Sequence, residues 1–400
     1  MKYNFLKHNP HDEIFTYDAI NELDKRYSLP LYIYDGGAAA DNAMEIKEIL
    51  GNKVRLCYSV KANYFIAEAL DNTVDMFEVC TGGELEYCLR NNISGDKLVY
   101  NGVWKSEQDL QCALEAGVNK LVLDSVEQAQ QLQDVAKEPV KVFLRLSSGN
   151  QFGMSLEEIV KIEEDRSRYS RLDIQGIHYY AGTQRSCVRQ VKEDIQILTE
   201  ALEYLQSRGI RIEEIQMGGG LGVPLYVCDN VREYEETADY LFTFIQTLSG
   251  RYNVTYECGR VIVANAGKYI TQIFEKKRRK NREILLVKGG SHHLRYYGNV
   301  VGQRQPFIDS VRRNITTEEC RYMICGSLCS AGDILSMTYT QKRIEKGDYM
   351  IFYNAGAYSL QEASSLFLTM EMPCVLVYNK NINNQKLVEI GWTYSDRRIV

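Results

Sequence analysis

The chain has 400 residues, of which 45% are hydrophobic and 25% are charged, and its 47 basic and 53 acidic side chains give a net charge of −6. This length suits two domains, or one barrel-sized domain with an appendage. The mild acidity argues against nucleic acid as the main partner. No apolar stretch approaches the roughly 18 residues that cross a bilayer, so we expect no membrane partner either.

Cysteine and histidine usage narrows the class further. The eleven cysteines are odd in number and irregularly spaced, which is typical of reduced thiols in a cytoplasmic protein. The polar start of the chain, Met1–Asp12, lacks the apolar core of a signal peptide. There is no C-x-x-C pair, and there are only five histidines, so we expect no metal site.

The first two thirds of the chain alternate short apolar runs with amphipathic stretches. Helical periodicity marks Ser106–Ala116, Ser125–Ala136 and Gln190–Ser207. The eight strand-like runs are Val54–Val60, Asp75–Val79, Lys97–Tyr100, Lys120–Asp124, Val140–Leu146, Asp173–Tyr180, Glu213–Met217 and Val254–Glu257. Eight strands that alternate with helices predict an α/β fold, a (β/α)8 TIM barrel.

After Ala266 the pattern changes to strands with little helix between them, which predicts a mainly β second domain. The expected strands there are Tyr269–Phe274, Ile284–Val287, Glu319–Cys325, Tyr349–Tyr353, Leu366–Met370 and Cys374–Tyr378. Leu31–Tyr34 is a further strand, which we expect to pair with the C-terminal strands because chain ends often meet. We therefore divide the chain into an N-terminal segment that joins the β domain (1–35), a barrel (36–266) and a C-terminal β domain (267–400). The basic run Lys276–Arg282 is interpreted as a solvated loop at the domain junction, with a phosphate- or carrier-binding patch as the alternative.

Lys61 closes the first predicted barrel strand, in the sequence Cys57-Tyr58-Ser59-Val60-Lys61-Ala62-Asn63. A lysine at the end of a buried strand is costly unless it is paired, neutralised or used in chemistry. Burial lowers the pKa of an ammonium group, and a neutral lysine amine reacts with aldehydes to form a Schiff base. In isolation such a lysine is usually a surface residue or half of an ion pair, so its meaning depends on the segments that follow.

Polar and glycine-rich signals follow the other strands at the end where barrel enzymes place their chemistry. Met217-Gly218-Gly219-Gly220-Leu221-Gly222 ends the seventh strand, and Glu257-Cys258-Gly259-Arg260 ends the eighth. A glycine run lets backbone N–H groups approach an anion, although alone it is as well explained by a tight turn. Arg260 adds a cation suited to phosphate. Glu257 suits a protonated pyridine nitrogen, because a carboxylate favours the charged form of its partner. Aldehyde, ring nitrogen and phosphate together describe pyridoxal 5'-phosphate.

At this point the chain resembles the fold-type III pyridoxal-phosphate decarboxylases, which include the diaminopimelate, ornithine and arginine enzymes. The likeness runs from about Leu31 to Leu366. The matching segments, in order, are Tyr58–Asn63, Glu78–Glu84, His178–Gln184, Gly218–Gly222, Glu257–Arg260, Gly326–Asp333 and Asn354–Tyr358. The resemblance implies an alanine racemase-like barrel, a following β domain, and a homodimer with shared active sites.

The resemblance also assigns roles to individual residues. Lys61 would carry the cofactor as an internal aldimine, with Glu78 beside it where the family has an aspartate. Glu257 would pair with the ring nitrogen, and Tyr180 stands where the family stacks an imidazole on the ring. The residues around the phosphate would be Thr183, Gly219, Gly220, Gly259, Arg260 and Tyr358. Cys329 matches a cysteine that the other subunit supplies to protonate the substrate carbon after carbon dioxide leaves, a step for which a neutral thiol is suited.

The substrate is expected to differ from that of the diaminopimelate and ornithine enzymes. These have an acidic residue directly after the cysteine to hold a distal amino group, and here that position is Ser330. The segment Gly289-Gly290-Ser291-His292-His293 is similar to a subgroup that decarboxylates amino acids attached to something larger, such as glutamyl groups on a carrier protein or siderophore conjugates. Candidate substrate contacts are Arg145, His293, Ser330 and Tyr358.

The leading hypothesis is therefore an α-decarboxylase of an amino acid or of a carrier- or siderophore-linked conjugate. One alternative is a decarboxylase of a free amino acid of the diaminopimelate, ornithine or lysine type. Another is an amino-acid racemase, which Glu257 disfavours because racemases of this fold typically place arginine at the ring nitrogen. A third is a cofactor-binding regulator without turnover, which the β domain and Cys329 disfavour.

Overall fold

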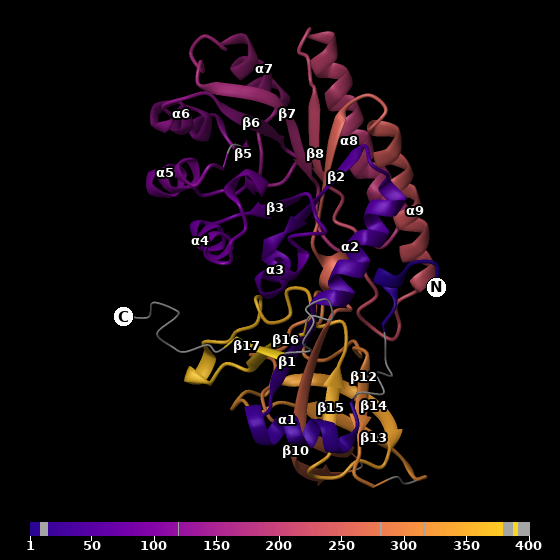
Figure 1. The fold of residues 1–400 in the computed structure, drawn as a ribbon. Coiled ribbons are helices and arrows are strands. Elements are labelled where there is room, and N and C mark those ends of the chain that lie inside the picture. The colour runs from indigo at the N-terminus through magenta and orange to yellow at the C-terminus, as the bar shows by residue number, and fades with distance from the viewer. Residues whose placement is uncertain (9–14, 119, 281, 315–316, 379–386, 391–400) are drawn as a thin grey trace.

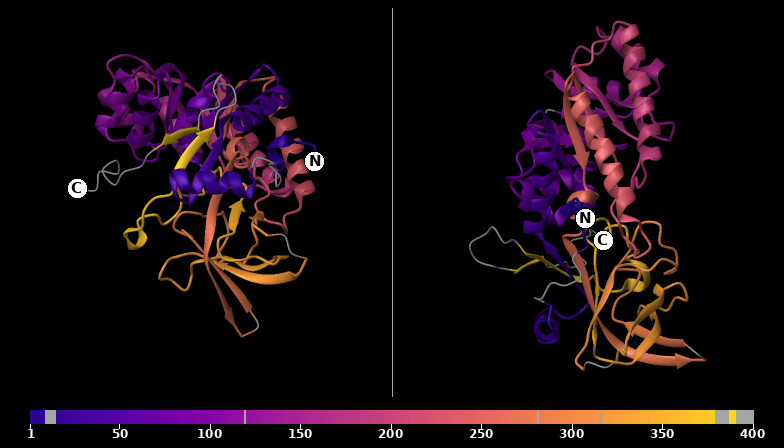
Figure 2. Two further views of the ribbon diagram at one scale, coloured as in Figure 1. Left: turned by 60° about the horizontal axis from the view of Figure 1, so that its bottom comes forward. Right: turned by 90° about the vertical axis from the view of Figure 1, so that its right-hand side faces the viewer.

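The structure, a computed structural model, describes residues 1–8, 15–118, 120–280, 282–314, 317–378 and 387–390. Figure 1 shows a barrel wrapped by helices and, beneath it, a mainly β domain. The two views of Figure 2 show the same division. Within the described residues, no helix is both long enough and apolar enough to cross a membrane.

Eight parallel strands close the barrel, as predicted from the apolar runs, and the first strand pairs with the last. Each predicted boundary differs from the observed one by at most one residue. The strands are β2 (Val54–Ser59), β3 (Met76–Val79), β4 (Leu98–Tyr100), β5 (Lys120–Leu123), β6 (Val140–Leu146), β7 (Leu172–Tyr180), β8 (Glu214–Gly218) and β9 (Asn253–Cys258).

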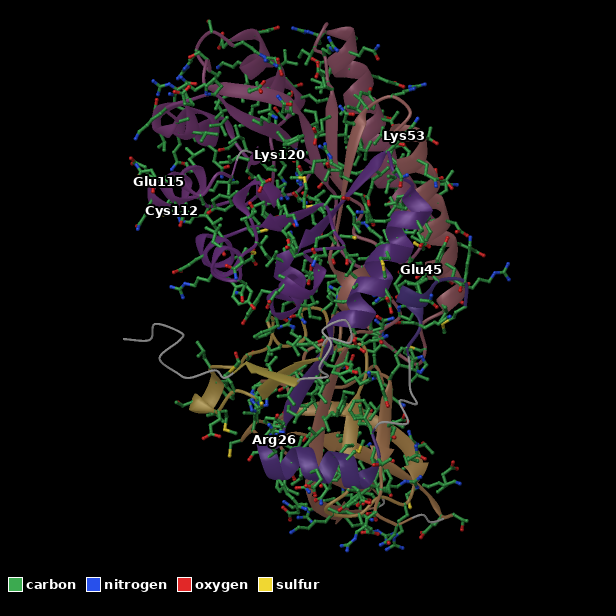
Figure 3. The ribbon with its side chains drawn as sticks, in the orientation of Figure 1. Arg26, Glu45, Lys53, Cys112, Glu115 and Lys120 are labelled. Atoms are coloured by element: carbon green, nitrogen blue, oxygen red, sulfur yellow. The ribbon has the colours of Figure 1, made fainter. Side chains whose placement is uncertain are left out.

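Helices connect these strands and cover the outside of the barrel (Figure 1). They are α2 (Gly36–Leu50), α3 (Ala67–Leu70), α4 (Gly82–Arg90), α5 (Glu107–Glu115), α6 (Val126–Val135), α7 (Leu156–Glu164), α8 (Val188–Ser207), α9 (Val231–Leu248) and α10 (Arg260–Val263). Side-chain caps set several helix starts: Ser106 begins α5 with a capping box to Asp109, and Ser125 caps α6. Cys112 and Glu115 lie exposed on the outer side of α5 (Figure 3).

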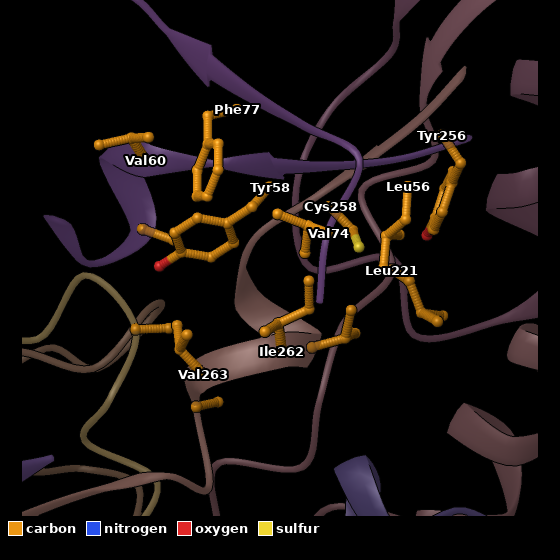
Figure 4. Packing of buried hydrophobic residues seen from close by; sticks show 14 of the residues in the cluster. Leu56, Tyr58, Val60, Val74, Phe77, Leu221, Tyr256, Cys258, Ile262 and Val263 are labelled. Carbon is orange, nitrogen blue, oxygen red and sulfur yellow. The ribbon is translucent and has the colours of Figure 1, made fainter. Parts of the chain in front are cut away.

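The outward faces of the barrel strands pack against the helices. Tyr58 of β2 meets the edge of the Phe77 ring of β3, with ring centroids 6.2 Å apart. Figure 4 shows these rings close to Ile262 and Val263 of α10, which follows the last barrel strand. This packing fixes the barrel rim on which Lys61 and Arg260 stand.

The second domain is built on a nine-stranded sheet to which the N-terminal β1 (Leu31–Asp35) belongs. As expected, β1 pairs with C-terminal strands: antiparallel to β10 (Gly267–Arg279) and parallel to β16 (Cys374–Tyr378). Helix α1 (Tyr17–Tyr27) places Ile20 in a cluster with Leu31 and Ile270 of this sheet. The other strands are β11 (Arg282–Val287), β12 (Ile308–Val311), β13 (Glu319–Cys325), β14 (Ile334–Lys342), β15 (Tyr349–Phe352) and β17 (Leu387–Ile390).

Two predictions in this domain were wrong. The basic run Lys276–Arg282 is not a loop at the domain junction, because Lys276–Arg279 of β10 pair with Arg282–Leu285 of β11 in a hairpin that extends away from the barrel (Figure 2). Leu366–Met370 is not a strand: η5 (Phe367–Thr369) is a 3-10 turn with Leu368 at φ +57°. Leu366, Phe367 and Leu368 are exposed, so their apolar character does not reflect burial in the sheet.

Candidate active site

The interior of the barrel is layered, with an apolar floor below a polar level. Five buried residues from successive strands form the floor: Cys57, Met76, Val99, Val122 and Phe143. Residues two positions further along a strand point to the same side. Those residues are Ser59, Glu78, Asn101, Asp124 and Arg145, and all are buried. Strand periodicity therefore places polar groups from five different strands at one level.

Lys61 lies just past the end of β2, in the short 3-10 turn η2 (Val60–Ala62). Its Nζ donates to both oxygens of Glu78, at 2.8 and 3.0 Å, and lies 3.5 Å from the Cys80 sulfur. Burial opposes the charge on this amine, but its electrostatic interactions with the Cys80 sulfur and the Glu78 carboxylate raise the pKa of Lys61 well above its ordinary value. Burial likewise raises the pKa of Glu78, yet the charge and hydrogen bonds of Lys61 lower it to about 2. Of the possibilities that the sequence left open for Lys61, the structure shows pairing, because its amine is bonded to Glu78.

Glu257 lies near the end of β9, the strand that pairs with β2 on the side away from β3, and is almost fully buried. One carboxylate oxygen accepts a hydrogen bond from the Gln216 amide of β8. The other lies 3.1 Å from Nε2 of His178 on β7. Asn101 lies between the two acids: its amide nitrogen donates to Glu78 at 2.8 Å and is 3.3 Å from the same His178 nitrogen.

The backbone next to Arg260 forms a concave cradle. Gly220 has φ +56°, and a Cβ there would lie 1.9 Å from the carbonyl oxygen of Gly182. A Cβ at Gly259 would lie 2.7 Å from that of Ala62. The Arg260 guanidinium lies 3.5 Å from the Thr183 hydroxyl and above the Tyr358 ring, 4.6 Å from its centroid. Among the described residues, the buried Nε of Arg260 has no hydrogen-bond partner.

These groups line a single cavity, together with Lys61 and Glu257. Its lining residues are Ser59, Lys61, Tyr180, Thr183, Gly220, Leu221, Glu257, Cys258, Gly259, Arg260 and Tyr358. The Lys61 amine lies 5.6 Å from the centroid of the Tyr180 ring. The residues present fit pyridoxal phosphate. The Lys61 amine matches its aldehyde, the Glu257 carboxylate matches its ring nitrogen, and the glycine-rich cradle with the Arg260 guanidinium matches its phosphate. Gly219 belongs to the same β8 loop but does not line the cavity.

A second cavity of about 410 Å³ adjoins the first and shares Lys61 and Tyr180 with it. Its walls include Asn101, Arg145 and Phe152, and the exposed Trp104 lies at its edge. Arg145 is buried and donates to Asp124 at 2.8 Å, with its guanidinium 4.8 Å from the Phe152 ring centroid. This space is where a substrate can approach Lys61.

The remaining predicted residues lie in the β domain and line neither cavity within the described part of the chain. Cys329 and Ser330 are exposed on the loop between β13 and β14. Asp333 fixes this loop: its carboxylate accepts from the backbone N–H groups of Ser291 and Leu328 at 2.7 and 2.9 Å. His293 is buried, its Nε2 2.7 Å from the carbonyl oxygen of Glu371, and burial together with His292 lowers its pKa to about 3.

Sequence reasoning did not single out Asn101, Gln216 or Cys80 as parts of this site. Asn101 and Gln216 belong to no glycine-rich or charged motif, whereas Cys80 lies within the matching segment Glu78–Glu84 but was given no role there. The available signal was the period of two within each strand, which puts Asn101 level with Glu78 and keeps Gln216 inside the barrel.

Comparison with known proteins places this geometry in a family. The profile of the pyridoxal-dependent decarboxylase family, pyridoxal binding domain, matches residues 39–264. The chain therefore belongs to the pyridoxal-dependent decarboxylases. It is an enzyme that uses pyridoxal phosphate to decarboxylate an amino acid.

Individual relatives cover nearly the whole chain. A diaminopimelate decarboxylase of Aquifex aeolicus is 24% identical over 91% of this chain and 90% of its own length. The L-glutamyl-[BtrI acyl-carrier protein] decarboxylase of Niallia circulans is also 24% identical, over 88% of this chain and 90% of its own. The solved diaminopimelate decarboxylase of M. jannaschii in complex with L-lysine superimposes with a TM-score of 0.81 at 21% identity, covering 95% of this chain and 94% of that one. This last likeness establishes the fold.

Proposed function

We propose that the enzyme removes the α-carboxylate of its substrate with Lys61 as the cofactor-bearing lysine and with Cys329 of the partner subunit as the proton donor in a homodimer. The observation that carries the proposal is the single cavity lined by Lys61, Glu257 and the Gly220–Arg260 cradle. These groups come from the first and the last strands of the barrel, yet together they provide a partner for the aldehyde, the ring nitrogen and the phosphate of one cofactor.

Each residue has a distinct task in this proposal. Glu78 holds the Lys61 amine at the rim, and Lys61 must release a proton before it bonds to an aldehyde. Glu257 accepts a hydrogen bond from the ring nitrogen, while Arg260, Gly220, Gly259 and Thr183 bind the phosphate. When bound, pyridoxal phosphate withdraws the electron pair left behind as carbon dioxide departs.

After carbon dioxide leaves, a proton must be donated to the substrate carbon, and the donor must reach the second cavity. Cys329 is exposed on its own protomer and lies in the other domain, so it suits delivery to the site of a second subunit. We also propose that the substrate side chain lacks a distal ammonium. Ser330 offers no carboxylate beside Cys329, and Asp109, which lines the second cavity, already accepts from the N–H and hydroxyl of Ser106. An amino acid whose far end is an amide or thioester, as in a carrier-linked conjugate, meets this requirement.

Cofactor attachment is tested by substitution of Lys61. Purified protein should take up pyridoxal phosphate and show the long-wavelength absorbance of the lysine-linked cofactor. Lys61→Ala should lose this absorbance, whereas Lys53→Ala, at an exposed lysine, should keep it. A wild-type protein that binds no cofactor would refute the assignment of the site.

The proton donor and substrate are tested by turnover. Carbon dioxide release should be measured with free diaminopimelate, ornithine, lysine and glutamate, and with glutamate attached through an amide or to a carrier protein. Cys329→Ala should slow turnover at least about tenfold without changing cofactor absorbance, because only the proton donor is removed. Cys112→Ala, at an exposed thiol on α5, serves as the control.

A free diaminopimelate substrate is the second candidate, because diaminopimelate decarboxylases are prominent among the relatives that span the chain. Release of carbon dioxide from diaminopimelate but not from the conjugates would select this candidate and refute the proposal of a substrate without a distal ammonium.

A further inference from the structure

The environment of Glu257 contains two partners that the proposed reaction leaves without a role. His178 is fully buried on β7, and Gln216 is fully buried on β8. Each lies against one oxygen of the Glu257 carboxylate. Buried polar side chains are costly unless they are paired, so this arrangement requires an explanation in terms of what it holds in place.

The position of the His178 proton follows from its neighbours. Nε2 faces a carboxylate oxygen of Glu257 at 3.1 Å and the amide nitrogen of Asn101 at 3.3 Å. If Nε2 carries the proton, it donates to an ionised Glu257. If Nε2 is bare, it accepts from Asn101, and Glu257 must carry a proton to satisfy the contact.

The two arrangements differ at the other ring nitrogen. Nδ1 of His178 is buried and has no partner among the described residues. A bare Nε2 would place an N–H donor at this site, and orphaned buried N–H groups are rarer and more costly than orphaned acceptors. Asn101 also has a shorter bond, at 2.8 Å to Glu78, and Gln216 already donates to Glu257 from the other side. The proton therefore lies on Nε2.

We infer that His178 is a positioning residue which, together with Gln216, donates to Glu257 and holds its carboxylate in the orientation that accepts from the ring nitrogen of pyridoxal phosphate. The inference rests on the proposed role of Glu257 in the function above. Two fixed donors leave Glu257 as an acceptor only, so a ring nitrogen can bond to it only by carrying a proton. The histidine thus acts on the cofactor through the acid, without touching it.

The test compares two ligands that differ at one atom: pyridoxal phosphate and its 1-deaza analogue, in which carbon replaces the ring nitrogen. Affinities are measured by equilibrium titration of the cofactor-free chain. His178→Phe removes the donor and should weaken pyridoxal phosphate binding about tenfold, the effect of one charge-assisted hydrogen bond, while the analogue binds as it does to wild type. His178→Gln keeps an N–H near the Nε2 position and should stay within about threefold of wild type.

Two further variants separate a direct role from a packing effect. His292→Phe removes another fully buried imidazole, one in the β domain with no contact to Glu257, and should leave both affinities unchanged. In a Glu257→Gln background, His178→Phe should have no additional effect on the preference between the ligands, because the group through which it acts is already neutral. If His178→Phe disturbs packing, His178→Met offers an adaptable apolar replacement.

The outcomes distinguish the role inferred for His178 from the role proposed for Glu257. If His178→Phe weakens both ligands equally, or neither, the positioning role of His178 is refuted. If wild type itself does not prefer pyridoxal phosphate over the analogue, and Glu257→Gln changes nothing, then the role assigned to Glu257 fails and the proposed function with it. A preference that Glu257→Gln abolishes but His178→Phe preserves would overturn this inference alone.

Discussion

Gly220 has a left-handed backbone conformation that residues with a side chain rarely adopt. It also lies where there is no room for a Cβ atom. Its φ is +56°, and a Cβ would lie 1.9 Å from the carbonyl oxygen of Gly182. Gly209, at the end of α8, has a similar φ of +76° but nothing within 4 Å of the Cβ position. Substitutions at these two glycines therefore distinguish the cost of a strained backbone, which both share, from damage to the phosphate cradle, which only Gly220 can cause.

We predict that Gly209→Ala lowers the free energy of unfolding by about 1 kcal/mol and leaves cofactor affinity unchanged. Gly220→Ala should cost more stability and weaken pyridoxal phosphate binding at least about tenfold, because the β8 loop must move away from the Gly182 carbonyl. Urea unfolding and cofactor titration measure the two effects. Equal cofactor affinities in both variants would show that Gly220 does not shape the phosphate site.

The Glu78–Lys61 pair predicts a specific pH dependence of stability. The pKa of Glu78 is lowered to about 2, below its unfolded value of 4.5. A carboxylate with a depressed pKa contributes stability that is fully present above the unfolded value and is lost as the pH falls toward the folded one. In cofactor-free protein, the stability advantage of wild type over Glu78→Gln should be no more than about 3 kcal/mol at pH 6 and should shrink between pH 4.5 and 2. Urea unfolding across this range measures it, and a difference independent of pH would contradict the ion pair.

At the scale of elements, Asp333 connects the Cys329 loop to the segment that begins at Gly289. Its two carboxylate oxygens each accept one backbone N–H, from Ser291 and Leu328. Asp348 does the same at another turn of this domain, where it accepts from Arg313 and Glu345. Both aspartates are buried, which makes them a matched pair.

We predict that Asp333→Ala and Asp348→Ala each cost about 2–4 kcal/mol, because each leaves two backbone donors unpaired. Only Asp333→Ala should also lower turnover, with cofactor absorbance unchanged, since only Asp333 orders the loop that carries Cys329. Unfolding curves and carbon dioxide release provide the two readouts. A normal turnover rate for Asp333→Ala would separate this loop from the reaction.

The barrel was predictable because each of its strands is a short, largely apolar run, and stretches with helical periodicity separate these runs. Three β-domain strands were missed, namely Ile308–Val311, Ile334–Lys342 and Leu387–Ile390, and the first two were missed for the opposite reason. Ile308–Val311 holds polar residues at its centre, and Ile334–Lys342 alternates small polar with apolar residues, so neither has a continuous apolar signal. Leu366–Leu368 gave that signal without a strand, because apolar residues also occur exposed on surfaces.

The candidate site was predictable where residues cluster in motifs, as at Gly218–Gly222 and Glu257–Arg260. It was not predictable where single polar residues stand inside apolar strands. Asn101 and Gln216 are separated by more than a hundred residues, and only closure of the barrel brings them to either side of His178. The raised pKa of Lys61 depends on strand pairing, since Glu78 lies on β3, the strand that pairs with β2.

At the scale of the whole molecule, the proposed homodimer makes a prediction that a monomer does not. Lys61→Ala and Cys329→Ala should each be inactive or nearly so alone. After subunit exchange in an equal mixture, half of the dimers contain one of each variant, and each of these holds one intact site, so roughly a quarter of wild-type activity should return. Activity measured before and after exchange tests this, with size-exclusion chromatography as the check on dimers. No recovery despite verified exchange would place both residues in the same subunit's site.

The location of β1 has a consequence for how the chain is made. The strand is complete within the first 35 residues, yet the neighbours on its two edges are β10 and β16, which begin at Gly267 and Cys374. During synthesis β1 leaves the ribosome long before its partners and must wait, with one hydrogen-bonding edge open, until β16 has been translated. The sheet of the β domain is therefore completed after all eight barrel strands have been made, so the barrel has time to form first.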